Sequence, residues 1–153
     1  GDGDLAQTAI GQGSLLVTPL RMAMLAAGIA NKGVLMRPYL VSKVTAPDGA
    51  VVKQYSPAEF LAVSNAALAG AVSKMMVAVV AEGTGYGARI GGVQVAGKTG
   101  TAENPHGDPH AWFIGFAPAD NPQIAIAVIA ENAGAGGGVA APIARQVMAR
   151  ALR

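Results

Sequence analysis

Residues 93–103 have the sequence Val-Gln-Val-Ala-Gly-Lys-Thr-Gly-Thr-Ala-Glu, which combines a strand-like start with a charged and hydroxyl-bearing end. Val93 and Val95 alternate with smaller or polar neighbours, which is typical of an extended strand. The strand continues into Lys98, which is followed by two threonines on either side of Gly100. A positive charge and two hydroxyl groups at the end of one strand predict a ligand-binding site.

Alternation along this strand constrains how the site is built. Lys98 and Thr99 should point to opposite faces of a sheet, so both serve one site only if the strand lies at the edge of a cleft with its backbone turned to the ligand. Gly100 has no Cβ and would let a ligand backbone approach closely. The N–H of Thr101 could then donate to an oxygen that becomes negative during a reaction, and Lys98 would face a carboxylate.

Three longer helices are expected. Thr18 and Pro19 form a typical helix start, a capping hydroxyl followed by proline, for a helix to about residue 30 whose mostly apolar circumference predicts burial. Ser64 is expected to cap a second helix to about residue 81. The periodicity of residues 141–153 predicts a terminal helix with its arginines outward.

Strands are expected on both sides of these helices. Residues 39–45 and 50–55 flank a Pro-Asp-Gly turn signal, which predicts a hairpin at the rim. Residues 110–117 and 123–131 are apolar on both faces and should be central strands, antiparallel because their joining loop is short. A capping box at residues 56–59 predicts a short helix after the hairpin.

The remaining segments are interpreted as loops. Residues 104–109 should form a loop beside the site, in which His106, together with nearby His110, is solvated rather than a metal ligand. The glycine-rich residues 134–138 are interpreted as a flexible linker. Residues 1–4 resemble a loop remnant, so we expect the chain to be a fragment.

The order of elements predicts an α+β fold, one antiparallel sheet flanked by helices. At 153 residues with 52% hydrophobic and 13% charged residues, the chain can bury one core and is not disordered. Its net charge of +2 is scattered, which argues against nucleic-acid binding. There is no cysteine, and the longest apolar run, residues 124–130, is too short to span a membrane, so any anchor is expected outside this chain.

Several motifs together resemble one family. Residues 97–101 are similar to the third motif, K-T-G, of the penicillin-recognising serine transpeptidases and β-lactamases. Further matching segments cover nearly the whole chain: Ile10-Gly11-Gln12-Gly13, Thr18-Pro19-Leu20, Ile29-Ala30-Asn31-Lys32-Gly33, Glu82-Gly83-Thr84-Gly85 and residues 111–118. In this order they resemble the C-terminal half of the transpeptidase domain of class B penicillin-binding proteins.

The resemblance implies a penicillin-recognising fold and acyl transfer on peptidoglycan stem peptides that end in D-alanyl-D-alanine, with β-lactams as inhibitors. It assigns catalytic roles to Lys98 and to the N–H of Thr101, and binding of the terminal carboxylate to Thr99, Gly100 and Thr101. Two more residues, Thr84 and Glu103, are expected as possible cleft-lining residues. No cofactor and no metal are implied.

The nucleophile is not in this chain. Each serine, at positions 14, 42, 56, 64 and 73, lacks a lysine three residues later, and none begins an S-x-N motif. A hydroxyl without a base is a poor nucleophile. We therefore expect residues 1–153 to be the C-terminal portion of one domain, inert alone, whose N-terminal portion carries both missing motifs and is a partner for activity. The resemblance also implies a location at the outer face of the bacterial plasma membrane.

Other functions stay open from the residues. A non-catalytic sensor of β-lactam or stem peptide would share the fold, as would a β-lactamase or D,D-carboxypeptidase that transfers to water. Residues 92–99 also match the phosphate-loop pattern G-x-x-x-x-G-K-[ST]. A phosphate loop must open a helix, however, and the residues around Lys98 are strand-like, which argues against nucleotide binding.

Overall fold

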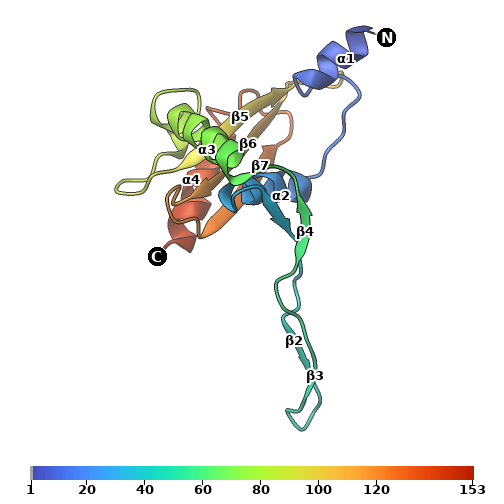
Figure 1. The fold of residues 1–153 in the computed structure, drawn as a ribbon. Helices are drawn as coiled ribbons and strands as arrows, with labels where there is room; N and C mark the ends of the chain where they lie inside the picture. The colour runs from blue at the N-terminus through green and yellow to red at the C-terminus, as the bar shows by residue number, and fades with distance from the viewer. Residues whose placement is uncertain (1) are drawn as a thin grey trace.

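A three-stranded antiparallel sheet forms the centre of the molecule (Figure 1). The computed structural model describes residues 2–153, and the side chains of residues 5–153. The strands are β5 (Ala96–Ala102), β6 (His110–Ala117) and β7 (Ile124–Ala130), in the spatial order β5-β6-β7 with unbroken register. The predicted meander is confirmed, and β5 lies at an edge of the sheet. Its start is shifted, because β5 begins at Ala96, after Val93 and Val95, whose alternation predicted the strand.

Helices cover both faces of this sheet. On one face, α2 (Pro19–Ala30) contacts β6 and β7, and α3 (Ala66–Ala81) contacts β5. On the other face α4 (Ala140–Ala151) packs against β6 and β7, beside the short 3-10 helix η1 (Tyr86–Ala88). The predicted α+β class, an antiparallel sheet flanked by helices, is therefore confirmed.

Two fully buried phenylalanines of β6 anchor the two sides of the core. Phe116 packs with Met76 of α3 on one face, and Phe113 packs with Met148 of α4 on the other. Their positions follow the alternation of side chains along a strand. Each buried aromatic ring removes a large apolar area from water, so the central strand holds helices on both sides.

Glycines in β5 and β6 leave room for the ring of Phe113. Gly97 and Gly115 are direct partners across the two strands. A Cβ on Gly97 would collide with the ring of Phe113, and a Cβ on Gly115 would lie 2.5 Å from the carbonyl oxygen of Ala96. The ring of Phe113 therefore packs directly on the backbone of Gly97 and Gly115.

The predicted helix starts are confirmed with small shifts. Thr18 caps α2, its Oγ1 accepting the N–H of Arg21 at 3.3 Å. The cap of α3 is Asn65 rather than Ser64, because the Asn65 side chain accepts the N–H of Leu68 at 2.8 Å. The prediction that the first helix is buried was wrong for Leu25, which is 43% exposed, because the sheet covers only one side of α2.

The predicted hairpin is confirmed and extends away from the sheet (Figure 1). It consists of β2 (Lys43–Thr45) and β3 (Val51–Gln54). At its turn Gly49 has φ 87°, and the Asp48 carboxylate accepts the N–H of Ala50 at 2.9 Å. All residues of both strands are exposed.

The short helix predicted from the capping box at residues 56–59 was wrong. That region forms β4 (Glu59–Ala62), which pairs antiparallel with β1 (Val34–Met36). A cap contributes about 1 kcal/mol to a helix. Pairing with β1 instead gives partners to backbone groups of several residues at once, and this distant partner is not visible in the local pattern.

The first residues also differ from the prediction. A helix, α1 (Asp2–Ala9), covers most of the segment interpreted as a loop remnant, while Gly1 lies outside the described residues. α1 lies at the end of the sheet to which β5 runs, opposite the hairpin (Figure 1). No helix among residues 2–153 has the length and apolar character required to cross a membrane.

Substituting Gly115→Ala should destabilise the protein by about 1–3 kcal/mol, because the new methyl group overpacks the contact with Ala96. Thermal unfolding of the purified protein measures this effect. Gly70→Ala is the matched control, since a Cβ at this α3 position meets nothing within 4 Å and should stabilise the helix by about 1 kcal/mol. Equal melting temperatures for the two variants would contradict this account of the β5–β6 contact.

Candidate functional site

The predicted site residues lie on the open edge of the sheet. β5 pairs with β6 on one side only, and within residues 2–153 no other strand pairs with it. Lys98 and Thr101 are exposed, whereas Thr99 is only 9% exposed. The edge position that the alternation of Lys98 and Thr99 required is therefore present.

The side chain of Lys98 reaches from its face of the sheet to this edge. Its Nζ donates a hydrogen bond to the carbonyl oxygen of Thr99 at 2.5 Å. Further along the edge, the carboxamide of Gln12 donates to the carbonyl oxygen of Thr101 at 3.1 Å and accepts the N–H of Glu103 at 3.3 Å. These three backbone groups belong to alternate residues and are contacted from outside the sheet.

The N–H of Thr101 shares this orientation. In an antiparallel strand the N–H and C=O of one residue point to the same edge, and neighbouring residues point to opposite edges. Because the Thr101 carbonyl faces Gln12, the Thr101 N–H also faces away from β6. The open edge thus combines an ammonium group with an outward N–H, two groups that stabilise negative charge.

Thr84 is joined to the site by a hydrogen bond between two hydroxyl groups. Its Oγ1 lies 2.6 Å from Oγ1 of Thr99. Thr84 follows the end of α3, which itself contacts β5. A hydroxyl has one proton to donate, so a Thr99 that donates to a ligand must accept from Thr84. Thr84 therefore lies just after the end of α3 and beside the predicted ligand-binding residues.

Glu103 and Gly100 reach the site through their backbones. The N–H of Glu103 bonds to Gln12, while its side chain is exposed. Gly100 lies opposite Trp112 of β6, and a Cβ there would come within 3.1 Å of the Trp112 Cβ. Trp112 is half-buried on the same face as Ile114 and Phe116, as the alternation predicted.

The glycine-rich segment at residues 134–138 is packed against the site, so its interpretation as a flexible linker was wrong. Gly136 is buried, and a Cβ on it would collide with the carbonyl oxygens of Gly100 and Trp112. A Cβ on Gly137 would collide with the carbonyl oxygen of Thr84. These glycines allow backbone to pack directly on backbone behind the site strand.

The two histidines do not form a metal site with their neighbours. His106 is exposed in the loop after β5, and Nδ1 of His110 accepts the backbone N–H of Asn132 at 3.0 Å. Across residues 2–153, no group of three or more His, Cys, Asp or Glu side chains could hold a metal ion. Lys98 lies in a strand and opens no helix, so the phosphate-loop alternative is excluded by the fold.

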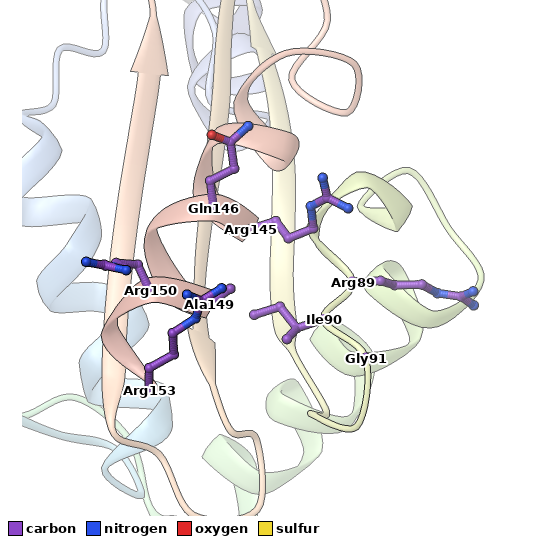
Figure 2. A pocket seen from close by; sticks show the side chains of 8 residues that line it. All are labelled: Arg89, Ile90, Gly91, Arg145, Gln146, Ala149, Arg150 and Arg153. Atoms are coloured by element: carbon purple, nitrogen blue, oxygen red, sulfur yellow. The ribbon is translucent and has the colours of Figure 1, made fainter.

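A groove of about 460 Å³ lies elsewhere, between the segment at Arg89–Gly91 and the C-terminal half of α4 (Figure 2). Arg145, Arg150 and Arg153 line it, with no acidic side chain. Arg89 also lines the groove, but its guanidinium donates to the carbonyl oxygens of Val80 and Ala81 at the end of α3. No predicted site residue lines this groove, since the candidate site is an open strand edge rather than an enclosed cavity.

Sequence reasoning missed two contributions to the site. Gln12 lies in a matched segment but received no role, because its partners Thr101 and Glu103 are about 90 positions away. The glycines at 136 and 137 were read as flexible because composition does not show what a glycine packs against. No local signal links residues 134–138 to the motif at residues 97–101, because the two segments are brought together only by the fold.

The chain belongs to the penicillin-binding protein transpeptidase family. Residues 2–149 match the family described as the penicillin-binding protein transpeptidase domain.

Mycobacterial proteins are among the relatives of this chain. It is 43% identical to the peptidoglycan D,D-transpeptidase PbpA of Mycolicibacterium smegmatis and 42% identical to PbpA of Mycobacterium tuberculosis, over 97% of this chain and 32% of each relative. A structure of penicillin-binding protein A from M. tuberculosis, a ceftriaxone acyl-enzyme complex, has a TM-score of 0.91 at 42% identity, covering 97% of this chain and 35% of that one. The chain thus spans about a third of the length of these relatives.

The hydrogen bond between Thr84 and Thr99 should be measurable as a coupling. In a double-mutant cycle, Thr84→Val and Thr99→Val should each destabilise the protein, and the double variant should lose about 1 kcal/mol less than the sum. Denaturant unfolding measures all four proteins. A second cycle that pairs Thr84→Val with Thr45→Val in the hairpin should be additive. Additivity in the first cycle would show that the two hydroxyls do not depend on each other.

Proposed function

We propose that the full-length protein is a peptidoglycan D,D-transpeptidase that works through a serine acyl-enzyme and is inhibited by β-lactams. The observation that carries this proposal is the open edge of β5, where the Lys98 ammonium group and the outward N–H of Thr101 lie on one backbone. A carboxylate-bearing, extended peptide fits such an edge, because main-chain groups can pair with it while a cation holds its charged end.

The N–H of Thr101 is proposed as an oxyanion donor. A serine oxygen would attack the carbonyl carbon of the penultimate D-alanine of a stem peptide, and the carbonyl oxygen would become negative in the tetrahedral intermediate. A preorganised backbone N–H aimed at that oxygen lowers the barrier by about 3 kcal/mol. The carbon–nitrogen bond to the terminal D-alanine then breaks, and D-alanine leaves as an amine after gaining a proton.

Lys98 and the two threonines are proposed to hold the terminal carboxylate. Lys98 is exposed and reaches the edge, so its charge is available to an incoming anion. Thr99 would donate a hydrogen bond to the carboxylate while accepting one from Thr84, which gives the buried hydroxyl a defined direction. Thr101 has an exposed side chain and would add a second hydroxyl. Gly100 between them leaves room for the ligand backbone.

The serine and its base are proposed to lie in a part of the protein outside residues 1–153. No serine in this chain begins S-x-x-K, and an acyl-enzyme needs a nucleophile with a base that takes its proton. That part would lie against the open edge of β5 and complete the cleft. An amine from a neighbouring stem peptide would then attack the ester, form the cross-link and release the serine.

The relatives support this reaction class. The M. smegmatis and M. tuberculosis proteins are named peptidoglycan D,D-transpeptidases, and structures of M. tuberculosis penicillin-binding protein A are described as acyl-enzyme complexes with ceftriaxone and penicillin G. We propose stem peptides and β-lactams as ligands of this protein too. We also propose that the full-length protein acts at the outer face of the plasma membrane, where peptidoglycan is built, and that its anchor lies outside residues 1–153.

Labelling with a fluorescent penicillin tests the proposal. The full-length protein should form a covalent adduct, and residues 1–153 alone should form none because they contain no activated serine. Lys98→Met in the full-length protein should lower the rate of labelling by about 100-fold, since it removes the charge that orients the ligand. Lys43→Met, in the exposed hairpin, is the matched control and should label normally.

Two results would contradict the proposal. Covalent labelling of the isolated chain would place a nucleophile inside it, and a full-length protein that takes no label would not be a penicillin-binding enzyme. The lifetime of the adduct then distinguishes the reaction class, because a hydrolase releases its acyl group within seconds and a transpeptidase retains a β-lactam for hours. Cross-linking of a donor stem to an acceptor amine separates an enzyme from a sensor.

A further inference from the structure

Gln12 is placed at the candidate site by a segment that is otherwise exposed. From Leu5 to Arg21 every residue is exposed except Gln12, which is half-buried. The apolar side chains of Ile10 and Leu16 are 77% and 93% exposed. An amide sheltered between exposed apolar residues reverses the usual order of burial, so a specific contact must hold it.

That contact is a pair of hydrogen bonds from one carboxamide to one strand. Nε2 of Gln12 donates to the carbonyl oxygen of Thr101 at 3.1 Å, and Oε1 accepts the N–H of Glu103 at 3.3 Å. A carboxamide has the same donor and acceptor as a peptide group. At the open edge of β5, the side chain of Gln12 therefore takes the place that a neighbouring strand would occupy.

The backbone around Gln12 is built to present it. The N–H of Gly11 donates to the carbonyl of Thr8 at 3.0 Å, and the N–H of Gln12 donates to the carbonyl of Gln7 at 2.9 Å. With φ 77° at Gly11, this is the Schellman pattern that ends a helix, here α1. Gln12 thus occupies a fixed position after a helix end rather than a random position in a loop.

Gly13 contributes a second constraint on the other side of Gln12. Its φ is 78°, a conformation that side-chain-bearing residues rarely adopt. A Cβ on Gly13 would also lie 2.9 Å from Oε1 of Gln7. Both glycines of Gly-Gln-Gly are required by the backbone, and together they direct the residue between them toward β5.

We propose that Gln12 is a positioning residue of the candidate site, which fixes the peptide units after Gly100 so that the N–H of Thr101 stays aimed at the reacting oxygen. The proposal rests on the function proposed above. The end of an edge strand frays readily, and Gly100 adds backbone freedom immediately before Thr101. The two hydrogen bonds of Gln12 hold the strand on the far side of that glycine, where pairing with β6 ends at Ala102.

If a ligand instead pairs with β5 where Gln12 now binds, removing Gln12 should have the opposite effect on the acylation rate. An extended ligand that pairs with β5 could use the carbonyl of Thr101, which Gln12 occupies. If Gln12 were a competitor, removing it would speed acylation. If it positions the N–H of Thr101, removing it slows acylation.

The experiment uses the full-length protein with Gln12→Ala, Gln12→Glu and Gly11→Ala, and with Gln54→Ala on the exposed hairpin as the matched control. Acylation by a fluorescent penicillin is resolved into the affinity before reaction and the limiting acylation rate. Gln12→Ala should lower the limiting rate about tenfold while changing the affinity less, because a displaced donor acts on the transition state. Gly11→Ala should reproduce this loss, because alanine disfavours the positive φ that presents Gln12.

Gln12→Glu separates the two hydrogen bonds. A carboxylate still accepts the N–H of Glu103 but cannot donate to the carbonyl of Thr101, so this variant should acylate as slowly as Gln12→Ala. Amide hydrogen exchange of the peptide containing residues 100–104 gives a readout independent of activity. Exchange at Glu103 should be faster in Gln12→Ala than in the wild type or the Gln54→Ala control.

The outcomes can be told apart. A wild-type acylation rate in Gln12→Ala, or a faster one, overturns the proposal, as does unchanged amide exchange at residues 100–104. Melting temperatures of all variants show whether slower acylation results only from unfolding. If Gln12→Ala is unfolded, the acylation rates of Gly11→Ala and Gln12→Glu test the proposal. If the wild type itself takes no penicillin, the proposed function fails, and the exchange measurement still decides whether Gln12 holds this strand.

Discussion

The structure depends on one strand that is paired on only one side. β5 uses the groups on its inner edge to bond β6, and its outer edge is left to side chains. Unpaired backbone groups at an edge need partners. Here Lys98 and Gln12 provide them for carbonyls of the motif and for the N–H of Glu103. An edge held in shape by side chains keeps its form without being closed by another strand, and this is what a ligand that binds by main-chain contacts requires.

Close packing behind β5 is the second condition. Gly97 and Gly115 leave space for the ring of Phe113, and Gly136 packs on the backbone of Gly100 and Trp112. Any larger residue at these positions would separate the layers that position the strand. Gly137 packs closely on the carbonyl oxygen of Thr84, whose hydroxyl oxygen lies 2.6 Å from that of Thr99. The geometry of the hydroxyl pair and of the charged edge therefore depends on glycines, which allow close packing because they have no side chain.

At residues 56–62 the local sequence pattern predicted a helix, but pairing with a distant strand determined the structure. Residues 56–59 have the sequence pattern of a capping box, yet no helix follows them, and β4, which begins at Glu59, pairs with β1. A capping signal describes only four residues, whereas a strand pairing satisfies the backbone of two segments separated by the hairpin. Conversely, α2 and the hairpin turn matched their local signals, because Thr18 and Gly49 are determined by interactions within a few residues.

The helix starts, the central strands and the charged motif at Lys98 could be predicted from the order of residues, because these features depend on neighbours along the chain. The edge position of β5 was predicted on the condition that Lys98 and Thr99 serve one site, since alternation points them to opposite faces. Three contacts could not be predicted in this way: the hydrogen bonds of Gln12 to Thr101 and Glu103, the hydrogen bond between Thr84 and Thr99, and the packing of Gly136 on Gly100. Each of these contacts joins residues far apart in the chain, and a side chain's hydrogen-bond partner is fixed by the packing of whole elements, which no local pattern encodes.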